Sequence, residues 1–214
     1  MLILGHAGIT LGVAILLNSA LIKSGLLPVS ESQPSEHSQD SSPTPQEQRP
    51  LPSGRLSWLT SLANRIDIRL LLVGSLLPDI IDKPIGQLWL RGTLDNGRIF
   101  CHTLLFLLII TLIGVYLYRT RHRNWLLVLS GGVFTHLIFD EMWLAPGTLF
   151  WPLYGFAFER LEDLTYWVQG VWYRLFNNPA VYIPELIGAV IIVWFTVALV
   201  KRRKVYSFLT SGQV

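Results

Sequence analysis

The sequence is short of charge and of cysteine, and each shortage excludes a class of protein. Only 14% of its 214 residues are charged, 51% are apolar, and the mean hydropathy is +0.45. Soluble domains carry about 25% charged residues, so the composition indicates an integral membrane protein. The single cysteine, Cys101, excludes an internal disulfide. The net charge of +3 comes from basic residues in short loops and the tail, which indicates membrane topology and no nucleic-acid partner.

Four apolar stretches are long enough, or nearly so, to cross a hydrocarbon core that takes roughly 20 helical residues. They run at about 2–22, 101–118, 125–144 and 181–200. The first has no Lys or Arg before it and no small-residue cleavage site after it, so we interpret it as a retained helix. A further segment at 66–78 has a short uncharged run, and Pro78 is expected to end it. We predict an all-α fold, an integral membrane helical bundle of about five transmembrane segments, the second one short or re-entrant.

Composition divides the chain into three parts. Residues 1–27 contain the first transmembrane helix. Residues 28–57 are rich in Ser, Pro and Gln with few large apolar side chains, and we predict a disordered linker there. Residues 58–214 form the membrane helical domain. Within it, the amphipathic pattern of 158–176 predicts a helix that either lies on the membrane surface or packs on the bundle.

Two basic clusters orient the chain across the membrane. RTRHRN at 119–124 and KRRK at 201–204 should face the cytoplasm by the positive-inside rule. The linker and the C-terminal tail are then cytoplasmic, and the loop at 145–180 is outside. If the segment at 66–78 crosses, the residues that follow it and the amino terminus are also outside. We therefore expect a multi-pass protein of the plasma membrane.

Six metal-competent side chains sit at the edges of the apolar segments, and the topology, derived without them, places all six near the outer face. They are His6, Asp79, Asp82, His102, His136 and Asp140. Ionisable groups at membrane depth are costly, so their gathering on one face indicates a site. Imidazole and carboxylate are ligands that suit a divalent ion such as Zn²⁺.

The spacing within each motif leaves alternatives open. His136 and Asp140 lie four residues apart, so one ion can reach both, or Asp140 orients the His136 ring, or the two simply hydrogen-bond inside the bundle. Asp79 and Asp82 are paired carboxylates typical of hydrolases, or else a solvated helix end in which an aspartate lies near Lys83.

Two further residues have both a functional and a structural interpretation. Arg98 either stabilises negative charge on a substrate or anchors the chain at the interface. Glu185 fits the amino-terminal turn of the last helix as an acidic residue, and we expect no catalytic role for it.

The order of these motifs resembles the YdjM-like family, whose members are regarded as inner-membrane metal-dependent hydrolases by similarity to phospholipases. The resemblance rests on GHAG at 5–8, GSLLPDIID at 74–82, RIFCHT at 98–103, GGVFTHLIFD at 131–140 and PGTLFWP at 146–152. It implies an inner-membrane location and a metal site at His6, Asp79, His102, His136 and Asp140, with Asp82 as a further candidate.

The chain departs from the family pattern at two motifs. The family commonly shows His-Arg-Gly-x-Thr-His-Ser, and here Gly97 stands at the first histidine position while Arg98 and His102 remain. The usual Thr and Ser are Cys101 and Thr103. The usual Pro-Asp-x-Asp spacing is longer by one residue, because Ile80 and Ile81 separate the aspartates. One ligand is therefore missing or replaced.

These observations predict a metal-dependent hydrolase at the outer membrane surface, with membrane lipids as partners and a phosphoester or lipid-like substrate. A divalent ion, Zn²⁺ by preference, would be held by the six side chains, with Asp79 or Asp82 as general base and Arg98 beside the reacting group. The alternatives are a non-enzymatic membrane protein, such as an ion carrier or assembly partner, and a degenerate family member that keeps only the fold.

Overall fold

The computed structural model describes residues 2–23, 66–89, 96–158 and 164–212, so the predicted linker at 28–57 lies outside the described residues. The chain divides into two compact units, Met1–Ile15 with Ile66–Val214, and Leu16–Arg65. Among the described residues every regular element is a helix, which confirms the all-α prediction. All the candidate site residues belong to the first unit.

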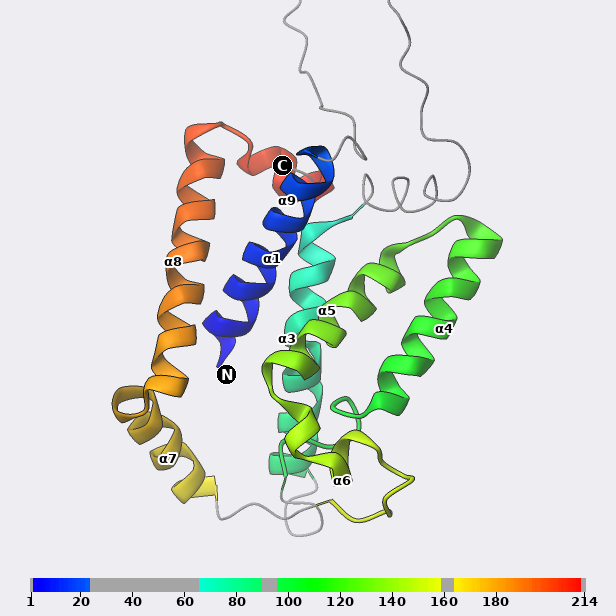
Figure 1. The fold of residues 1–214 in the computed structure, drawn as a ribbon, viewed down its shortest axis with the longest axis vertical. Coiled ribbons are helices and arrows are strands. Elements are labelled where there is room, and N and C mark those ends of the chain that lie inside the picture. The colour runs from blue at the N-terminus through cyan, green and yellow to red at the C-terminus, as the bar shows by residue number, and fades with distance from the viewer. Residues whose placement is uncertain (1, 24–65, 90–95, 159–163, 213–214) are drawn as a thin grey trace, which may run out of the picture. The chain divides into compact units, whose positions relative to one another are not determined.

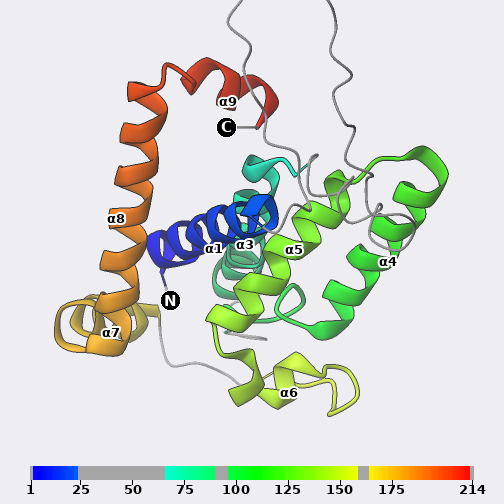
Figure 2. The same ribbon diagram turned by 45° about the horizontal axis from the view of Figure 1, so that its top comes forward.

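Figures 1 and 2 show the helices of the described residues. They are α1 (Ile3–Lys23), α3 (Ile68–Pro84), the π-helical η1 (Ile85–Trp89), α4 (Leu104–Arg121), α5 (Trp125–Phe139), the 3₁₀-helical η2 (Met142–Leu144), α6 (Pro146–Leu149), α7 (Leu164–Asn177), α8 (Pro179–Lys201) and α9 (Val205–Ser211). Helices α1, α4 and α8 are long and apolar enough to cross a membrane, and α5 is a shorter apolar helix. The predicted membrane bundle is confirmed.

The boundaries of two helices differ from those expected. Helix α3 continues through Pro78 to Pro84 instead of ending at Leu77. Pro78 is fully buried, so packing outweighs the local cost of a proline inside a helix. Helix α4 begins at Leu104 because the Thr103 hydroxyl accepts a hydrogen bond from the Phe106 N–H (3.1 Å) and caps it. His102 therefore lies in the loop before α4.

Helices α3 and α5 cross with their backbones in contact. A Cβ atom on Gly74 would collide with the carbonyl of Leu129, and one on Gly132 would collide with the backbone of α3 at Leu71. Small residues let helices approach closely inside a membrane. Close to this crossing, Val133 and Leu137 of α5 pack with Leu107 of α4 in an apolar core. The crossing fixes the site residues of α3 against those of α5.

Helix α1 is held against α8 by a second close crossing. A Cβ on Gly8 would collide with the backbone at Gly188. The buried carboxylate of Glu185 accepts hydrogen bonds from the Leu2 and Gly5 N–H groups, the latter at 3.0 Å. The expectation that Glu185 lies in the first turn of the last helix was wrong, because α8 already begins at Pro179 and the carboxylate caps the amino end of α1 instead. Figure 2 shows α1 meeting α8 near this end.

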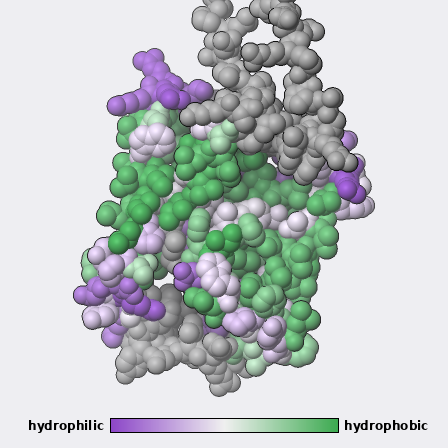
Figure 3. All heavy atoms as spheres, viewed as in Figure 1, coloured by the Kyte–Doolittle hydropathy of each residue, from purple (hydrophilic) through white to green (hydrophobic). Residues whose placement is uncertain are grey.

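The helix ends that carry the candidate site lie away from the basic clusters. Helices α4 and α5 pack together and are joined at their far ends through residues 122–124, next to Arg119 and Arg121. Helix α8 contacts the start of α1 at Glu185 and Gly188 and ends at Lys201 in the basic tail. Figure 3 shows mostly hydrophobic side chains over the helices and strongly hydrophilic ones near their ends.

Candidate metal centre

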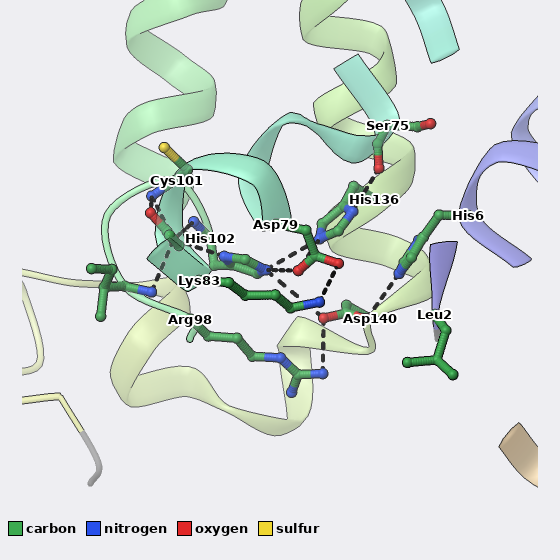
Figure 4. A network of polar contacts seen from close by, with 12 residues as sticks. Leu2, His6, Ser75, Asp79, Lys83, Arg98, Cys101, His102, His136 and Asp140 are labelled. Atoms are coloured by element: carbon green, nitrogen blue, oxygen red, sulfur yellow. Dashed lines mark hydrogen bonds and ion pairs between the residues drawn. The ribbon is translucent and has the colours of Figure 1, made fainter. Parts of the chain in front are cut away.

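The structure gathers the six predicted side chains from four parts of the chain (Figure 4). Helix α1 supplies His6, α3 supplies Asp79 and Asp82, the loop before α4 supplies His102, and α5 and its C-cap supply His136 and Asp140. All six are buried, and His6, Asp82, His102 and His136 have no exposed surface. Side chains of this type are buried together only where they satisfy one another or hold an ion.

Three donor atoms converge at the centre of the group, and an oxygen of Asp140 lies beside them. The Nε2 atoms of His102 and His136 are 3.1 Å apart. Asp79 Oδ1 lies 3.6 Å from His102 Nε2 and 3.9 Å from His136 Nε2, and Asp140 Oδ2 lies 3.9 Å from His102 Nε2. Four ligands around a tetrahedral zinc ion lie about 3.3 Å from one another, given bonds of about 2.0–2.1 Å. The spacing therefore suits a small divalent ion.

The hydrogen bonds behind the two imidazoles fix their tautomers. His136 Nδ1 lies 2.7 Å from the Ser75 carbonyl oxygen, and His102 Nδ1 lies 2.8 Å from Asp82 Oδ2. A carbonyl oxygen and a carboxylate accept and do not donate, so both Nδ1 atoms carry the hydrogen. In neutral rings both Nε2 atoms then present lone pairs to each other across 3.1 Å. Such an arrangement is repulsive unless a cation lies between them, and this is the donor set of a metal site.

Electrostatics favour positive charge at the same point. Burial alone lowers the pKa of the His102 imidazole, but the carboxylates of Asp79 and Asp82 outweigh burial and raise the pKa above its ordinary value. In the absence of an ion, a proton on Nε2 fills the position that faces His136. A proton and a metal ion thus compete for this lone pair.

Asp82 lies behind His102. Its carboxylate accepts hydrogen bonds from the backbone N–H groups of Ile99 (2.9 Å), Cys101 (2.9 Å) and His102 (3.2 Å), besides the His102 ring. These bonds wrap the loop before α4 around the end of α3. Asp82 therefore orients the His102 imidazole, as outer partners of metal-bound histidines do.

Asp140 contacts both His6 and Arg98. Its Oδ1 lies 3.1 Å from His6 Nε2, and its Oδ2 forms an ion pair with Arg98 (2.8 Å). Burial raises the pKa of the Asp140 carboxyl, but the His6 hydrogen bond and the Arg98 charge outweigh burial and hold the pKa below its ordinary range. The carboxylate is therefore ionised and able to bind a cation.

His6 is less completely bonded than the other two histidines. Its ring stacks on His136 with centroids 4.2 Å apart. Its Nδ1 is buried and has no hydrogen-bond partner in the part of the chain that the structure describes. Ligand atoms of His6, His136 and Asp140 also lie within 4.8 Å of one another, so a second group overlaps the first through His136.

Sequence reasoning missed the roles of three contributors. Ser75 acts through its backbone carbonyl, for which side-chain identity gives no signal. Lys83 bonds Asp79 Oδ2 at 2.6 Å, a contact that the four-residue spacing indicates, but in the structure it lies at a buried carboxylate and not at a solvated helix end. Glu185 positions α1, and so His6, from another helix, which spacing along the chain does not reveal.

Comparison with known families gives one match. The model of the YdjM inner membrane protein family matches residues 48–206. This range contains Asp79, Asp82, His102, His136 and Asp140, and it begins after α1. Searches of the curated proteins and of the solved structures gave no match. Since the match covers well over half of the chain, the chain belongs to the YdjM inner membrane protein family and is a membrane protein.

Proposed function

We propose that this protein is a metal-dependent hydrolase of the inner membrane. The observation that carries the proposal is the pair of Nε2 atoms, 3.1 Å apart, with both Nδ1 atoms committed to acceptors. His102, His136 and Asp79 would hold the ion, with Asp140 beside them. Mixed imidazole and carboxylate ligands around a compact position favour Zn²⁺.

The bound ion would supply a Lewis acid and promote ionisation of water near neutral pH. The chain itself supplies proton transfer and charge stabilisation. Asp82 is poorly suited to act as the general base, because its oxygens already accept from three backbone N–H groups and a histidine. Asp79 would hold the ion through Oδ1 and serve as the base through Oδ2, the oxygen that Lys83 contacts. The Arg98 side chain, which is 44% exposed, is placed to meet negative charge that develops on a substrate entering from solvent.

The arrangement of the helices supports a site that faces outward. The basic clusters lie at the helix ends away from the site, and the positive-inside rule assigns those ends and the C-terminal tail to the cytoplasm. Near the site, the connection after α5 exposes large apolar side chains, among them Leu153 (85% exposed) and Phe156 (81%). Apolar and aromatic side chains at a membrane edge favour the headgroup region. We therefore propose a phosphoester or lipid-like substrate drawn from that region.

A non-enzymatic role is the second candidate. The raised pKa of His102 allows a protonated His102 to donate to His136, which satisfies both rings without an ion. In that case the chain keeps the family fold and binds no metal. An ion carrier is less well supported, because a carrier needs polar groups spread across the membrane and these gather at one end of the helices.

Bound metal in the detergent-purified protein tests the proposal. We would measure zinc by elemental analysis in the wild type, His102→Ala, His136→Ala and the control His122→Asn, whose exposed site lies at the far end of α4. We expect stoichiometric zinc in the wild type and control, and its loss in both alanine variants. Wild type without zinc after reloading contradicts the proposal. A phospholipid hydrolysis screen with the loaded protein then tests the reaction.

A further inference from the structure

Two cationic side chains stand between the buried ligands and solvent. Lys83 Nζ is 2.6 Å from Asp79 Oδ2, and an Arg98 guanidinium nitrogen is 2.8 Å from Asp140 Oδ2. The side chains of Lys83 and Arg98 are 31% and 44% exposed, whereas those of the two aspartates are 9% or less. Figure 4 shows both cationic chains reaching toward these carboxylates. A ligand approaching from solvent therefore meets positive charge first.

The charges of the site indicate when an anion binds. Asp79, Asp82 and Asp140 carry three negative charges against the two positive charges of Lys83 and Arg98. With neutral histidines the group is negative by one charge, and a divalent ion makes it positive by one. The ion-loaded group thus favours an anion more strongly than the ion-free group does.

The chemistry of the two cations selects the kind of anion. A guanidinium presents a planar fork of donors that matches phosphate oxygens, and an ammonium adds a flexible point charge. They come from different elements, α3 and the loop before α4, and each is tied to a carboxylate that the proposed ion would share. Both charges are therefore held close to the position of the reacting atom.

We infer that Lys83 and Arg98 form a phosphate-binding rim, so that the substrate presents an anionic phosphate group rather than a neutral ester. The inference rests on the proposed function and names its substrate class. The phosphate belongs either to a lipid headgroup or to a soluble phosphate ester, which share this chemistry. Lys83 and Arg98 bind the phosphate oxygens, and the buried aspartates and histidines hold the ion beneath them.

Binding of inorganic phosphate to zinc-loaded, detergent-purified protein, followed by calorimetry, tests the inference. The variants are Lys83→Gln and Arg98→Gln, and the control is Lys201→Gln, an exposed lysine at the far end of α8. We expect phosphate to bind wild type and control only when zinc is present. Each rim variant should bind phosphate at least about tenfold more weakly with its zinc content unchanged, because a charge-assisted hydrogen bond is lost.

A conservative variant separates charge from geometry. Arg98→Lys keeps the charge and loses the fork, so it should recover part of the phosphate affinity that Arg98→Gln loses. If both glutamine variants bind phosphate as well as the wild type, or if they lose zinc in proportion to phosphate, the rim only holds the carboxylates and the inference is overturned. Wild type without zinc instead overturns the proposed function, and this inference with it.

The source of the phosphate is tested on the same proteins. Glycerol phosphate in solution and phosphatidic acid in mixed micelles would each compete against inorganic phosphate. Stronger competition by phosphatidic acid assigns the rim to a lipid headgroup, and equal competition assigns it to a phosphate group regardless of its carrier. A neutral diacylglycerol should not compete, and competition by it as strong as that of phosphatidic acid would contradict the inference.

Discussion

The two halves of the site are held in different ways. In the half made by His102 and His136, each ring has its Nδ1 bonded to an acceptor, on α3 in both cases. In the half made by His6 and Asp140, the His6 ring has one bonded nitrogen and one buried nitrogen without a partner in the described residues. The first half is therefore preorganised to present two lone pairs to an ion. In the second half, the hydrogen bond from His6 favours the ionised form of Asp140.

The family match separates His6 from the other five side chains. It covers α3, the loop before α4, and α5, and it begins after α1. The preorganised half thus lies within the sequence that defines the family. His6 comes from a helix that depends on α8, through Glu185 and the Gly8–Gly188 contact, for its position. We expect substitutions in the first half (His102 and His136) to lower the metal affinity more than substitutions in the second half (His6 and Asp140).

The largest effect is expected where α3 and α5 cross. Gly132→Ala places a Cβ against the Leu71 carbonyl and forces the helices apart, which should lower the free energy of unfolding by about 1–3 kcal/mol and remove bound zinc. Gly131→Ala is the matched control, because its nearest neighbour, a side-chain atom of Leu71, would be 3.6 Å away. Thermal unfolding and zinc content check both variants. Equal behaviour of the two would show that the crossing does not position the site.

A smaller effect is expected from the carboxylate behind His102. Asp82→Asn keeps the shape and removes the charge that fixes the ring and the loop, so zinc affinity should fall about 10–100-fold. Asp67→Asn, at the amino end of the same helix, is the control and should leave zinc affinity unchanged. Competition with a chelator measures both affinities. Unchanged affinity in Asp82→Asn would contradict the orienting role.

His6→Gln tests the second half directly. Glutamine keeps a donor for Asp140, so zinc affinity should fall less than about tenfold, and one zinc per chain should remain. The measurement is zinc stoichiometry beside His136→Ala. If His6→Gln lowers the stoichiometry from two zinc ions to one, the overlapping group of His6, His136 and Asp140 holds its own ion and the two halves are equivalent.

The smallest effect is expected from the cap on α1. Glu185→Gln keeps one of the two acceptor oxygens and loses the other together with the charge that favours the helix amino terminus. One of the two hydrogen bonds to α1 is then lost, which should cost about 1 kcal/mol of stability and change zinc affinity only a few-fold. Glu141→Gln, an exposed position, is the control. Thermal unfolding with and without zinc checks the result. A complete loss of zinc in Glu185→Gln would show that α1 is essential to the first half as well.

The fold could be predicted from the sequence because the length of each apolar stretch and the position of each basic cluster are properties of the local sequence. The spans appear as helices α1, α4, α5 and α8 close to the expected positions. The expectation that Pro78 ends its helix was wrong, because Pro78 is fully buried inside α3 and the local sequence does not reveal that burial.

The candidate site was predicted by residue type and topology, and the structure brings those six side chains together; their binding of a metal stays a prediction. The separate roles of these side chains could not be predicted from the sequence. Whether Asp82 faces the ion or the loop depends on where the backbone N–H groups of Ile99 and Cys101 point.

The unlike partners of His102 and His136 have a consequence for the strength of the two imidazoles as electron donors. A carboxylate behind a ring draws its N–H proton and makes the opposite nitrogen more basic, while a peptide carbonyl does so weakly. The His102 ring bonds the Asp82 carboxylate, and the His136 ring bonds the Ser75 carbonyl oxygen. An ion between the two rings would therefore be bound by one more basic and one less basic nitrogen. The residues that would hold the ion are thus unequal donors, with the stronger one in the loop before α4 and the weaker one on α5.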